Sequence, residues 1–427
     1  MSIKKIKILI LSDYAFTKGG AERVAISSAI GLSQKGHEVV CFFAVGPISD
    51  ELTEAGLKEV ICLNQKDILD SPNKFIAMLS GIYNWKAVRE LKKLLSCWIP
   101  DIVHVHGVSK ALSWAPINII YSHNIPIVYT LHDYGLICPN LGIYNFKTEK
   151  VCEYYKPRYK LKCLVVNCDK RSYAQKLWRW IRFFIVRNIF KINKKVSGYV
   201  AVSKFIVELA DKYIAGDKPV RVIYNPVETG EDRPKKCSNN DKKGINFLYV
   251  GRLSQEKGID LLLEVMCEVD AGLTIIGDGE LMNICMDYAR RLGKEKIRIL
   301  GFQNIKKIFD EMQKSSALIL PSILMEPAPL VLAEAAYNCL PSIVADHGGL
   351  IEFVKDGVNG LHFKAGSKKS LIKSMESIIK NPALSRRMGQ KAREIIARKD
   401  LSIENHLNKV EKYYDYILAI HNLNCNL

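Results

Sequence analysis

The chain has 427 residues, of which 48% are hydrophobic and 25% are charged, a balance typical of globular proteins with sizeable cores. At one domain per ~150 residues, this length predicts two or three domains. No apolar run reaches the ~18 residues of a membrane-spanning helix, and the run from Ile8 to Leu11 is too short for a signal-peptide core. We therefore expect a cytosolic protein whose 12 cysteines are reduced thiols or metal ligands.

Positive charge dominates the chain and is concentrated in one segment. The formal net charge is +18, which favours an anionic partner such as a nucleic acid, a membrane surface or a phosphorylated substrate. Between Lys147 and Lys195 the chain has 15 Lys or Arg residues against 3 Asp or Glu residues. This segment therefore carries most of the excess positive charge.

The first half of the chain alternates short apolar runs with helical patterns. The apolar runs predict buried strands at residues 6–11, 38–45, 101–106, 125–131 and 198–203. The first helical pattern ends at Gly36, as a helix with a glycine C-cap does. Continuous apolar strands separated by helices predict a parallel sheet that is covered on both faces.

A polar stretch, residues 228–244, separates this pattern from a second one of the same kind. Further strands are predicted at residues 245–250, 273–277, 297–300, 317–321 and 341–345. The sequence therefore predicts an α/β fold of two tandem doubly wound Rossmann-like domains, residues 1–227 and 245–400, joined by this linker. A last helix, residues 401–427, is expected to pack back toward the first domain. Ligands in such folds bind at the carboxyl ends of strands, so we expect a site in a cleft between two facing domains.

Charged and glycine-rich turns follow several predicted strands. Arg252 and Lys257 precede a helix that opens near Gly258, so two cations and a helix N-terminus could meet a diphosphate there. The alternative is a solvated basic loop. Gly277 lies in a second turn between a strand and a helix, although such turns are common in α/β proteins. The dinucleotide-binding pattern G-x-G-x-x-G is absent from the sequence.

Two glutamates, Glu326 and Glu334, lie eight positions apart in an apolar part of the chain. Glu326 falls in the loop after a predicted strand, and Pro329 suits the first turn of the helix that carries Glu334. Glu326 could instead be an acid favoured by the helix dipole, and Glu334 a buried glutamate held by the backbone or an arginine. A carboxylate can accept hydrogen bonds from two neighbouring hydroxyls, so the pair suits a ribose and a sugar ring.

Several short motifs, taken together and in order, resemble one enzyme family. They are GGAERV, VHVHG, YTLHDYGLICPN, VAVSKF, VIYNPV, YVGRLSQEKGID, IIGDGE, LGF, ILPS, EPAPLVLAEA and VADHGGLIE. This combination resembles the retaining GT-B glycosyltransferases of family 4, over about residues 6–400. Within the E-x7-E motif, PAP replaces the more usual aromatic residue and glycine, which bears on the identity of the sugar.

The resemblance implies roles for four residues near the reaction centre. Arg252 and Lys257 would bind the donor diphosphate, Glu326 would contact the donor hexose, and His132 would lie near the anomeric carbon. Retention in this family is usually explained by front-face attack, in which the leaving diphosphate helps to deprotonate the acceptor hydroxyl. The protein then mainly stabilises charge on the departing diphosphate. No D-x-D motif occurs in the sequence, which fits catalysis without a metal ion or other cofactor.

The resemblance also implies a set of substrate-binding residues. Glu334 would bind the ribose hydroxyls of the donor. The remaining implied substrate-binding residues lie where the backbone could approach the donor closely. They are Gly19, Gly20, Gly277, Gly348, Gly349 and Leu350. Gly19 and Gly20 follow the first strand, where a simple tight turn is the alternative interpretation. The glycines at 348 and 349 and the following leucine would offer backbone N–H groups to the sugar or phosphate.

Four cysteines, Cys138, Cys152, Cys163 and Cys168, cluster in a basic insertion at about residues 138–195. Zinc held by four thiolates is one interpretation, and irregular spacing without C-x2-C favours the alternative of ordinary buried thiols. Family members with the HDYxLICPN variant often carry a cysteine-rich insertion here, so the resemblance implies a structural zinc.

The stretch 171–195 has the pattern of an amphipathic helix. Its apolar face would comprise Leu177, Trp178, Ile181, Phe184, Ile185, Ile189 and Ile192. Its basic face would comprise Lys176, Arg179, Arg187 and Lys194. Such a helix suits the surface of an anionic membrane. The alternative is that the apolar stripe packs onto the N-terminal sheet and leaves the basic face outside.

These observations predict a retaining hexosyltransferase that uses a nucleotide-diphosphate sugar, most simply a UDP-sugar. The acceptor would be lipid-linked or a polysaccharide, at the cytoplasmic face of the membrane, in bacterial surface polysaccharide biosynthesis. A sugar-nucleotide epimerase or a phosphorylase on the same fold is the alternative, although an epimerase needs no basic, apolar acceptor face. A non-catalytic nucleic-acid-binding protein is a third interpretation, and no nucleic-acid-binding motif supports it.

Overall fold

The computed structural model describes residues 5–68, 70–108, 110–156, 160–227 and 244–425, so most of the predicted linker 228–244 lies outside the described residues. The chain divides into two compact units, and each is described by itself. Unit 1 comprises Met1–Gly142, Glu153–Pro226 and Ile403–Leu427. Unit 2 comprises Ile143–Cys152 and Val227–Ser402.

Unit 1 is built on a seven-stranded sheet in the order β3-β2-β1-β4-β5-β8-β9, and all of its strand pairs are parallel. The strands are β1 (Lys7–Tyr14), β2 (Glu38–Val45), β3 (Glu59–Cys62), β4 (Ile102–His106), β5 (Ile127–Leu131), β8 (Gly198–Ala201) and β9 (Val220–Val222). The five strands predicted here are confirmed. The sequence did not indicate β3 and β9, which are short and lie at the edges of the sheet.

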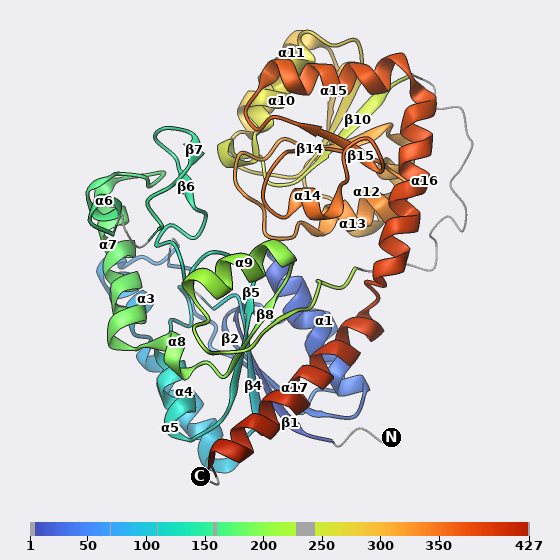
Figure 1. The fold of residues 1–427 in the computed structure, drawn as a ribbon. Helices are drawn as coiled ribbons and strands as arrows, with labels where there is room; N and C mark the ends of the chain where they lie inside the picture. The colour runs from blue at the N-terminus through green and yellow to red at the C-terminus, as the bar shows by residue number, and fades with distance from the viewer. Residues whose placement is uncertain (1–4, 69, 109, 157–159, 228–243, 426–427) are drawn as a thin grey trace. The chain divides into compact units, whose positions relative to one another are not determined.

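Helices cover both faces of this sheet (Figure 1). They are α1 (Gly20–Gln34), α2 (Asp50–Glu54), α3 (Lys74–Ile82), α4 (Trp85–Cys97), α5 (Ala115–Ser122), α6 (Lys160–Val165), α7 (Tyr173–Phe184), α8 (Ile192–Lys195), α9 (Lys204–Tyr213) and α17 (Ile403–Cys425). Several begin at a side-chain cap: the Asn84 side chain, for example, accepts a hydrogen bond of 3.0 Å from the Ala87 N–H at the start of α4.

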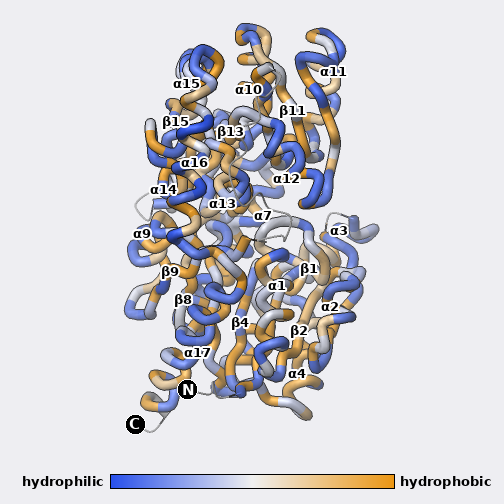
Figure 2. Tube along the Cα trace, turned by 90° about the vertical axis from the view of Figure 1, so that its right-hand side faces the viewer, coloured by the Kyte–Doolittle hydropathy of each residue, from blue (hydrophilic) through white to orange (hydrophobic). Residues whose placement is uncertain are grey.

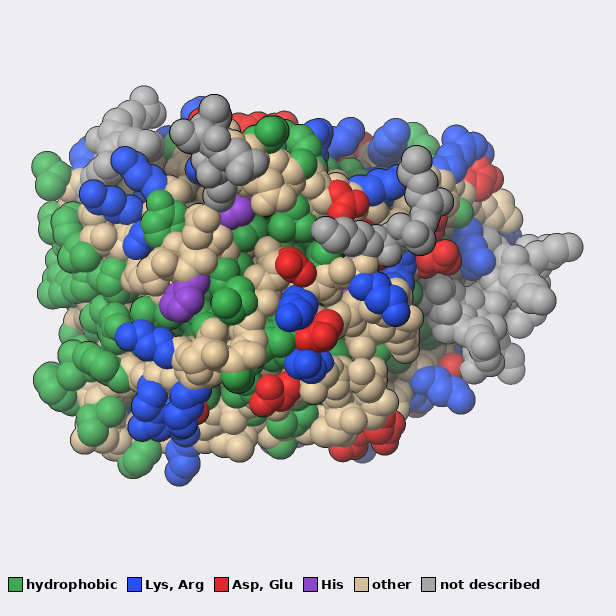
Figure 3. Space-filling view, turned by 90° about the horizontal axis from the view of Figure 1, so that it is seen from below, with side chains coloured by type: hydrophobic (Ala, Val, Ile, Leu, Met, Phe, Trp, Pro, Cys, Tyr) green, Lys and Arg blue, Asp and Glu red, His purple; other side chains and the backbone are tan. Residues whose placement is uncertain are grey.

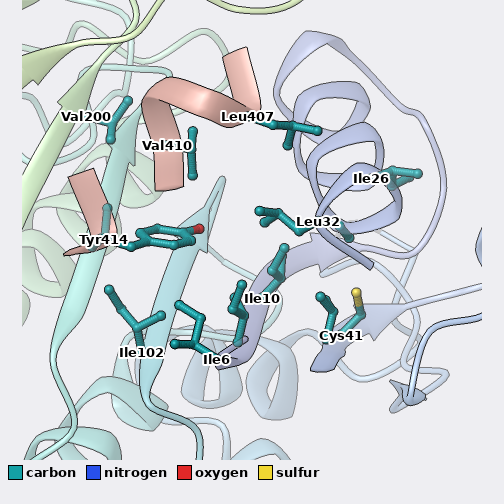
Figure 4. Packing of buried hydrophobic residues seen from close by; sticks show 14 of the residues in the cluster. Ile6, Ile10, Ile26, Leu32, Cys41, Ile102, Val200, Leu407, Val410 and Tyr414 are labelled. Atoms are coloured by element: carbon teal, nitrogen blue, oxygen red, sulfur yellow. The ribbon is translucent and has the colours of Figure 1, made fainter. Parts of the chain in front are cut away.

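The last helix, α17, belongs to the core of unit 1. Leu407, Val410 and Tyr414 of α17 face Leu32 of α1 and Ile10 of β1 in one cluster of buried residues (Figure 4). Burying such side chains contributes ~1.5–3 kcal/mol each, so this packing stabilises the end of the chain on the first sheet.

Unit 2 repeats the same architecture with a six-stranded parallel sheet in the order β12-β11-β10-β13-β14-β15. The strands are β10 (Asn246–Val250), β11 (Gly272–Ile276), β12 (Ile297–Ile299), β13 (Ala317–Leu320), β14 (Ser342–Ala345) and β15 (Gly360–Phe363). The five strands predicted for this half are confirmed. Two parallel-sheet α/β domains, as the sequence predicted, therefore make up the fold.

The helices of unit 2 lie on both faces of its sheet, α10, α11 and α15 on one side and α12, α13 and α14 on the other (Figure 1). Their bounds are α10 (Ile259–Met266), α11 (Met282–Leu292), α12 (Ile305–Lys314), α13 (Leu330–Tyr337), α14 (Leu350–Phe353), α15 (Lys368–Lys380) and α16 (Pro382–Lys399). Figure 2 shows hydrophobic residues along strands such as β2 and hydrophilic stretches on outer helices such as α11 and α15. This is the pattern expected when helices shield parallel strands from water.

A short hairpin departs from the predicted domain limits. Strands β6 (Tyr144–Asn145) and β7 (Lys150–Val151) pair antiparallel, and their segment groups with unit 2 although it lies within residues 1–227. Glu149 in this hairpin accepts a hydrogen bond of 2.6 Å from Gln255 Nε2. Strands of two residues give no periodic signal, so the sequence could not indicate that this segment belongs to unit 2.

The stretch 171–195 is not one continuous amphipathic helix. After α7 the backbone forms a π-helical turn, η2 (Ile185–Ile189), and then the short helix α8. Lys176, predicted on the solvated basic face, is fully buried, and its ammonium donates to Cys163 Sγ at 3.3 Å. The prediction of a basic outer face is therefore wrong for Lys176, because this lysine has polar partners inside the fold.

Candidate active site

The switch point of the sheet in unit 2 brings several predicted residues close together. In a doubly wound sheet, ligands bind beyond the carboxyl ends of strands where the strand order reverses. In unit 2 this point lies between β10 and β13, which pair in parallel. The loop after β10 carries Arg252 and Lys257, and the loop after β13 carries Glu326.

Lys257 ends a short 3-10 turn, η3 (Gln255–Lys257), and Gly258 follows with a φ of 69°. A Cβ atom at Gly258 would lie 2.1 Å from the Pro321 carbonyl oxygen. Only glycine fits both this left-handed backbone and this close approach. The glycine therefore lets the loop after β10 lie directly against the end of β13.

The side chains of Lys257, Glu326 and Ser322 form a connected cluster. The Lys257 ammonium lies 2.5 Å from Glu326 Oε1, and the Ser322 hydroxyl donates to the same oxygen at 2.8 Å. Glu326 is buried, so the ammonium and the hydroxyl offset the cost of removing this carboxylate from water. The structure thus brings together the predicted phosphate-binding lysine and the predicted sugar-binding glutamate.

The loop after β14 lies against the same cluster. Gly348 has a φ of 64°, and a Cβ atom on Gly349 would lie 2.1 Å from the Pro327 carbonyl oxygen. The Gly349 N–H donates to the Glu326 carbonyl oxygen at 2.7 Å. The protein itself therefore engages this N–H in the structure, and the role of Gly349 toward a ligand stays a prediction. Leu350 is buried at the start of α14.

Two further predicted residues, Arg252 and Gly277, lie in the turns after β10 and β11. The Arg252 side chain is exposed, while its carbonyl oxygen accepts a hydrogen bond of 2.7 Å from Tyr249 Oη. Gly277 has a φ of 140°, and a Cβ atom there would lie 1.9 Å from the Gly251 carbonyl oxygen. The turns after β10 and β11 therefore touch through backbone, which leaves the Arg252 guanidinium free to face solvent or an anion.

Glu334 is the fifth residue of the eight-residue helix α13, whose other residues are all apolar. Its side chain is buried, with 3% of the residue exposed, and Pro329 lies at the N-cap position, one residue before the first turn in which the sequence placed it. A buried carboxylate needs hydrogen bonds, and hydroxyl groups of a ligand supply them as well as protein groups do.

In unit 1, His132 follows β5 and is joined to a second histidine. His106, the last residue of β4, places Nδ1 3.1 Å from His132 Nε2. Burial lowers the pKa of His132 to about 3 and holds the pKa of His106 well below its ordinary value. His132 is therefore neutral at physiological pH, with one ring nitrogen engaged by His106. The sequence showed His106 only as part of VHVHG and gave it no role.

The buried histidines of unit 1 predict a stability that falls in acid. Burial lowers the pKa values of His104 and His106 well below 6.5, that of His132 to about 3 and that of His406 to about 4. The unfolded chain takes up protons near pH ~6.5 while the folded chain does not, so acid favours unfolding. Below that pH the free energy of unfolding should fall by up to ~1.4 kcal/mol per pH unit for each histidine.

Urea unfolding followed by circular dichroism at about pH 7.5, 6 and 5 measures this loss. We expect the urea midpoint to decrease at each step below about pH 6.5. An unchanged midpoint across this range would show that the four histidines are protonated in the folded protein.

A polar cluster in unit 1 was not indicated by the sequence. Gly19 caps α1 and Gly20 opens it, the loop before them carries Lys18, and Tyr14 is the last residue of β1. Tyr14 Oη bonds to Asp67 Oδ2, and the Lys18 ammonium lies 3.0 Å from the same oxygen. These three side chains line a cavity of about 630 Å³ beyond β1 and β2. Tyr14 and Asp67 are 53 positions apart, so no local pattern connects them.

The cysteines form no clear metal site. In the part of the chain that the structure describes, no group of three or more His, Cys, Asp or Glu residues is placed to hold a metal ion. Cys138, Cys152 and Cys168 are buried, and Cys163 accepts a hydrogen bond from the Lys176 ammonium. An ammonium beside the thiols does not help them to hold a cation, so the structural zinc remains a prediction.

Comparison with protein families places this geometry in a known class. Residues 18–231 match the family described as Glycosyltransferase Family 4, and residues 231–395 match the family described as Glycosyl transferases group 1. The first match alone covers half of the chain, and the two are contiguous. The chain therefore belongs to the family 4 glycosyltransferases.

Individual relatives agree with this assignment. The chain is 28% identical over 216 residues to an uncharacterized glycosyltransferase of Methanocaldococcus jannaschii, covering 51% of this chain and 58% of that protein. It is 25% identical over 351 residues to an uncharacterized protein in the cps region of Klebsiella pneumoniae, covering 79% and 84%. It is 23% identical over 403 residues to the glycogen synthase of Mycobacterium tuberculosis, covering 88% and 86%.

Solved structures share the fold. Sucrose-phosphate synthase from Thermosynechococcus elongatus matches with a TM-score of 0.71 and 16% identity, over 97% of this chain and all of that one. Anabaena HepE, solved in complex with UDP and glucose, matches with a TM-score of 0.66 and 17% identity, over 96% of this chain and all of that one. These neighbours are GT-B glycosyltransferases, so the fold is of the GT-B type.

Proposed function

We propose that this protein is a retaining glycosyltransferase that moves a hexose from a nucleotide-diphosphate sugar, with UDP as the nucleotide. The observation that carries the proposal is the cluster of Lys257, Glu326 and Ser322 at the switch point of unit 2, with Arg252 exposed beside it. A cation and a carboxylate held side by side suit a substrate that joins an anionic diphosphate to a polyhydroxylated ring.

Each residue then acts through its own contacts. The Lys257 ammonium and the Arg252 guanidinium stabilise negative charge on the departing diphosphate, which is the main electrostatic demand of this reaction. In the absence of donor, Glu326 neutralises Lys257, and a bound diphosphate would compete with Glu326 for the ammonium. The released carboxylate oxygen can then accept a sugar hydroxyl. His132 is neutral and joined to His106, and its place near the anomeric carbon is proposed from the resemblance alone.

The relatives support a nucleotide-sugar donor and a surface-polysaccharide role. HepE was solved with UDP-glucose, one relative is a protein of a cps region, and WaaG is described as a glycosyltransferase involved in lipopolysaccharide biosynthesis. A lipid-linked or polysaccharide acceptor at the membrane surface is the corresponding proposal for this chain.

The donor proposal is tested with a panel of UDP-, GDP- and ADP-sugars. We expect one nucleotide series, the UDP series, to raise the melting temperature of the full chain, because a ligand that binds only the folded state stabilises it. Free UDP should give part of the shift, and uridine without phosphates should give little. If no nucleotide sugar shifts the melting temperature at millimolar concentration, unit 2 is not a donor site.

Glu334→Gln should weaken donor binding by roughly 1–3 kcal/mol, because the amide loses charge-assisted hydrogen bonds to hydroxyls. Calorimetric titration with the active donor measures the loss, and circular dichroism checks that the variant folds. Glu295→Gln is the matched control, since Glu295 is exposed in the same unit. Unchanged donor affinity in a folded Glu334→Gln protein would remove the ribose-binding role.

Attachment to a membrane surface rests on the exposed apolar residues of α3 and α7. Phe75 and Ile76 of α3 are 69% and 58% exposed, and Ile181 and Phe184 of α7 are 40% and 45% exposed. The two helices are in contact, since Trp178 Nε1 donates to the Met78 carbonyl oxygen at 3.2 Å. Hydrophobic side chains gather along the left-hand edge of Figure 3, the side on which α3, α4 and α7 lie in Figure 1, with Lys and Arg beside them.

No helix among the described residues is long and apolar enough to span a bilayer. The proposed attachment therefore uses side chains that enter the interface while basic residues meet anionic lipid, at ~1 kcal/mol for each Lys or Arg.

Sedimentation with vesicles tests the attachment. Wild-type protein should pellet with anionic vesicles at low salt and less so at high salt, because salt screens the attraction. The Phe75→Asp/Ile181→Asp variant should remain largely in the supernatant. The control Ile99→Asp/Phe302→Asp, which changes two exposed residues elsewhere, should pellet like wild type. Equal pelleting of both variants, or no pelleting of wild type, would contradict the membrane role.

A further inference from the structure

A second cavity in unit 1 is distinct from the cavity beside Asp67. It has a volume of about 510 Å³, within the ~300–1,000 Å³ typical of pockets that enclose a small ligand. All of its lining residues belong to unit 1, and most come from α7, η2, α8 and the segments that pack on them. The proposed donor site does not use this cavity, although its lining includes Cys163 of the predicted metal site and Arg187 and Lys194 of the predicted basic face.

The wall of this pocket is largely aromatic. Trp180, Phe183, Phe184 and Tyr213 line it, and the rings of Trp180 and Phe184 stack with centroids 5.6 Å apart and planes at 17°. Aromatic walls exclude water and accept aliphatic chains with little loss of side-chain entropy. The wall therefore suits an apolar chain.

The same pocket carries cations and no acid. Arg187, Lys191 and Lys194 line it, and none of its lining residues is Asp or Glu. Arg187 donates to the carbonyl oxygens of Leu136 and Tyr213, which fixes its position in the wall. Lys191 and Lys194 are exposed, and neither ammonium has a hydrogen bond or ion pair to another described residue. The charge of the pocket is therefore complementary to an anionic group.

The backbone that presents these cations is unusual. Arg187 lies in the π-helical turn η2, and Lys191 adopts a left-handed conformation with a φ of 50°. π-Helical turns are rare and occur frequently at functional sites, and a left-handed lysine costs of order 1 kcal/mol. These turns place the three cations, which fall within eight residues of the chain, at one pocket.

We propose that this pocket binds the lipid end of the acceptor, as a single aliphatic chain that carries a phosphate group. The aromatic wall holds the chain, and Lys191, Lys194 and the Arg187 guanidinium hold the phosphate. That the bound lipid is part of the acceptor rests on the proposed glycosyltransferase function. That the pocket binds a lipid phosphate does not depend on this function. Ile181 and Phe184 of α7 are exposed beside the pocket, so the aliphatic chain of a lipid could pass over them from a membrane surface into the pocket.

Calorimetric titration of the full chain with decyl phosphate, below the concentration at which it forms micelles, tests the proposal. We expect saturable binding of decyl phosphate, at least tenfold weaker binding of decanol, and none of inorganic phosphate. Lys191→Glu/Lys194→Glu should lower the affinity for decyl phosphate at least tenfold. The control Lys92→Glu/Lys412→Glu makes the same change of net charge at exposed lysines elsewhere in unit 1 and should leave the affinity unchanged.

A second variant tests the pocket without changing charge. Asn188 is exposed and lines the pocket, so Asn188→Trp should fill it and abolish binding. The position of the ligand's aliphatic chain in the pocket is measured with 10-bromodecyl phosphate, because its bromine atom quenches the fluorescence of nearby tryptophans. Most of the quenching should disappear in Trp180→Phe and persist in Trp85→Phe, since Trp85 is an exposed residue of α4.

Several results would overturn the proposal. They are equal affinities for decanol and decyl phosphate, loss of binding in both charge variants, and quenching that persists in Trp180→Phe. Tighter binding of dihexanoyl phosphatidate than of decyl phosphate would identify a phospholipid site and overturn the assignment to the acceptor. UDP is titrated into the same samples, so a protein that binds UDP but not decyl phosphate retains the proposed function and lacks only this pocket role.

Discussion

Replacing Lys257 or Arg252 by alanine is expected to lower the turnover number at least about tenfold, which corresponds to ~1.4 kcal/mol of transition-state stabilisation. Charge accumulates on the diphosphate as the glycosidic bond breaks, and each variant removes one of the cations that meet it. The larger effect should come from Lys257→Ala, because it also leaves the buried Glu326 carboxylate without its ammonium partner.

The two variants should differ in stability as well as in rate. Arg252 is exposed, so its removal should change the melting temperature little, whereas Lys257→Ala should lower it. Steady-state kinetics and thermal unfolding of the same preparations measure both effects. Arg290→Ala, which removes an exposed cation on α11, is the control. Wild-type turnover in both Arg252→Ala and Lys257→Ala would show that the loop is merely basic and solvated.

Gly349→Ala should weaken donor binding and turnover through a steric clash with backbone. The added Cβ would lie 2.1 Å from the Pro327 carbonyl oxygen and 2.8 Å from that of Glu326, so the loop that carries Glu326 must move. Such overpacking costs typically ~1–3 kcal/mol, and a shifted Glu326 loses its contacts with Lys257 and Ser322. We expect at least a tenfold loss in kcat/KM together with a lower melting temperature.

Gly366→Ala is the matched control for this substitution. Gly366 has a φ of 71° in the same unit, and a Cβ atom there would meet nothing within 4 Å. This variant bears only the backbone cost of a left-handed alanine, ~1 kcal/mol, and should retain wild-type kinetics. If Gly349→Ala also retains wild-type kinetics, the close approach of the two loops does not matter for the reaction.

The sequence predicted ten of the strands of the two parallel sheets, and the loops that carry Lys257 and Glu326, because each gives a local signal. An apolar run of five residues indicates a buried strand, and a proline or glycine after it marks the loop that follows. Parallel strands then bring the loops after β10 and β13 to one edge. The sequence could not indicate that Lys257 and Glu326 form an ion pair, because they are 69 positions apart and the pairing depends on side-chain rotamers.

The interpretation of residues 171–195 shows where periodicity alone is insufficient. The spacing of apolar and basic residues predicts an amphipathic helix but does not say which face is buried. Lys176 and Arg182 are buried in unit 1, where Cys163 Sγ accepts a hydrogen bond from Lys176 and the Arg182 guanidinium lies 5.0 Å from the Trp178 ring centroid. Ile181 and Phe184 are exposed instead. Only the surrounding fold, which supplies those polar partners, decides between the two faces.

The cluster of Tyr14, Lys18 and Asp67 was missed for a related reason. Tyr14 ends β1, Lys18 lies in the loop after it, and Asp67 lies in the loop after β3, and the residue patterns around them do not connect the three. Burial and Asp67 raise the pKa of the Tyr14 hydroxyl, so it remains a hydrogen-bond donor. The only sequence signal was their common place at the carboxyl ends of β1 and β3, which is readable once strand order is known.

Consumption of a nucleotide sugar, followed by NMR in the presence of a chelator, tests the central claim most directly. With the donor chosen from the thermal-shift panel, wild-type protein should slowly release nucleoside diphosphate. The freed sugar should first appear with the anomeric configuration that it had in the donor. The Arg252→Ala/Lys257→Ala protein should release almost none. Inverted configuration would contradict a retaining transferase, and equal donor consumption by the double variant would contradict the proposed site in unit 2.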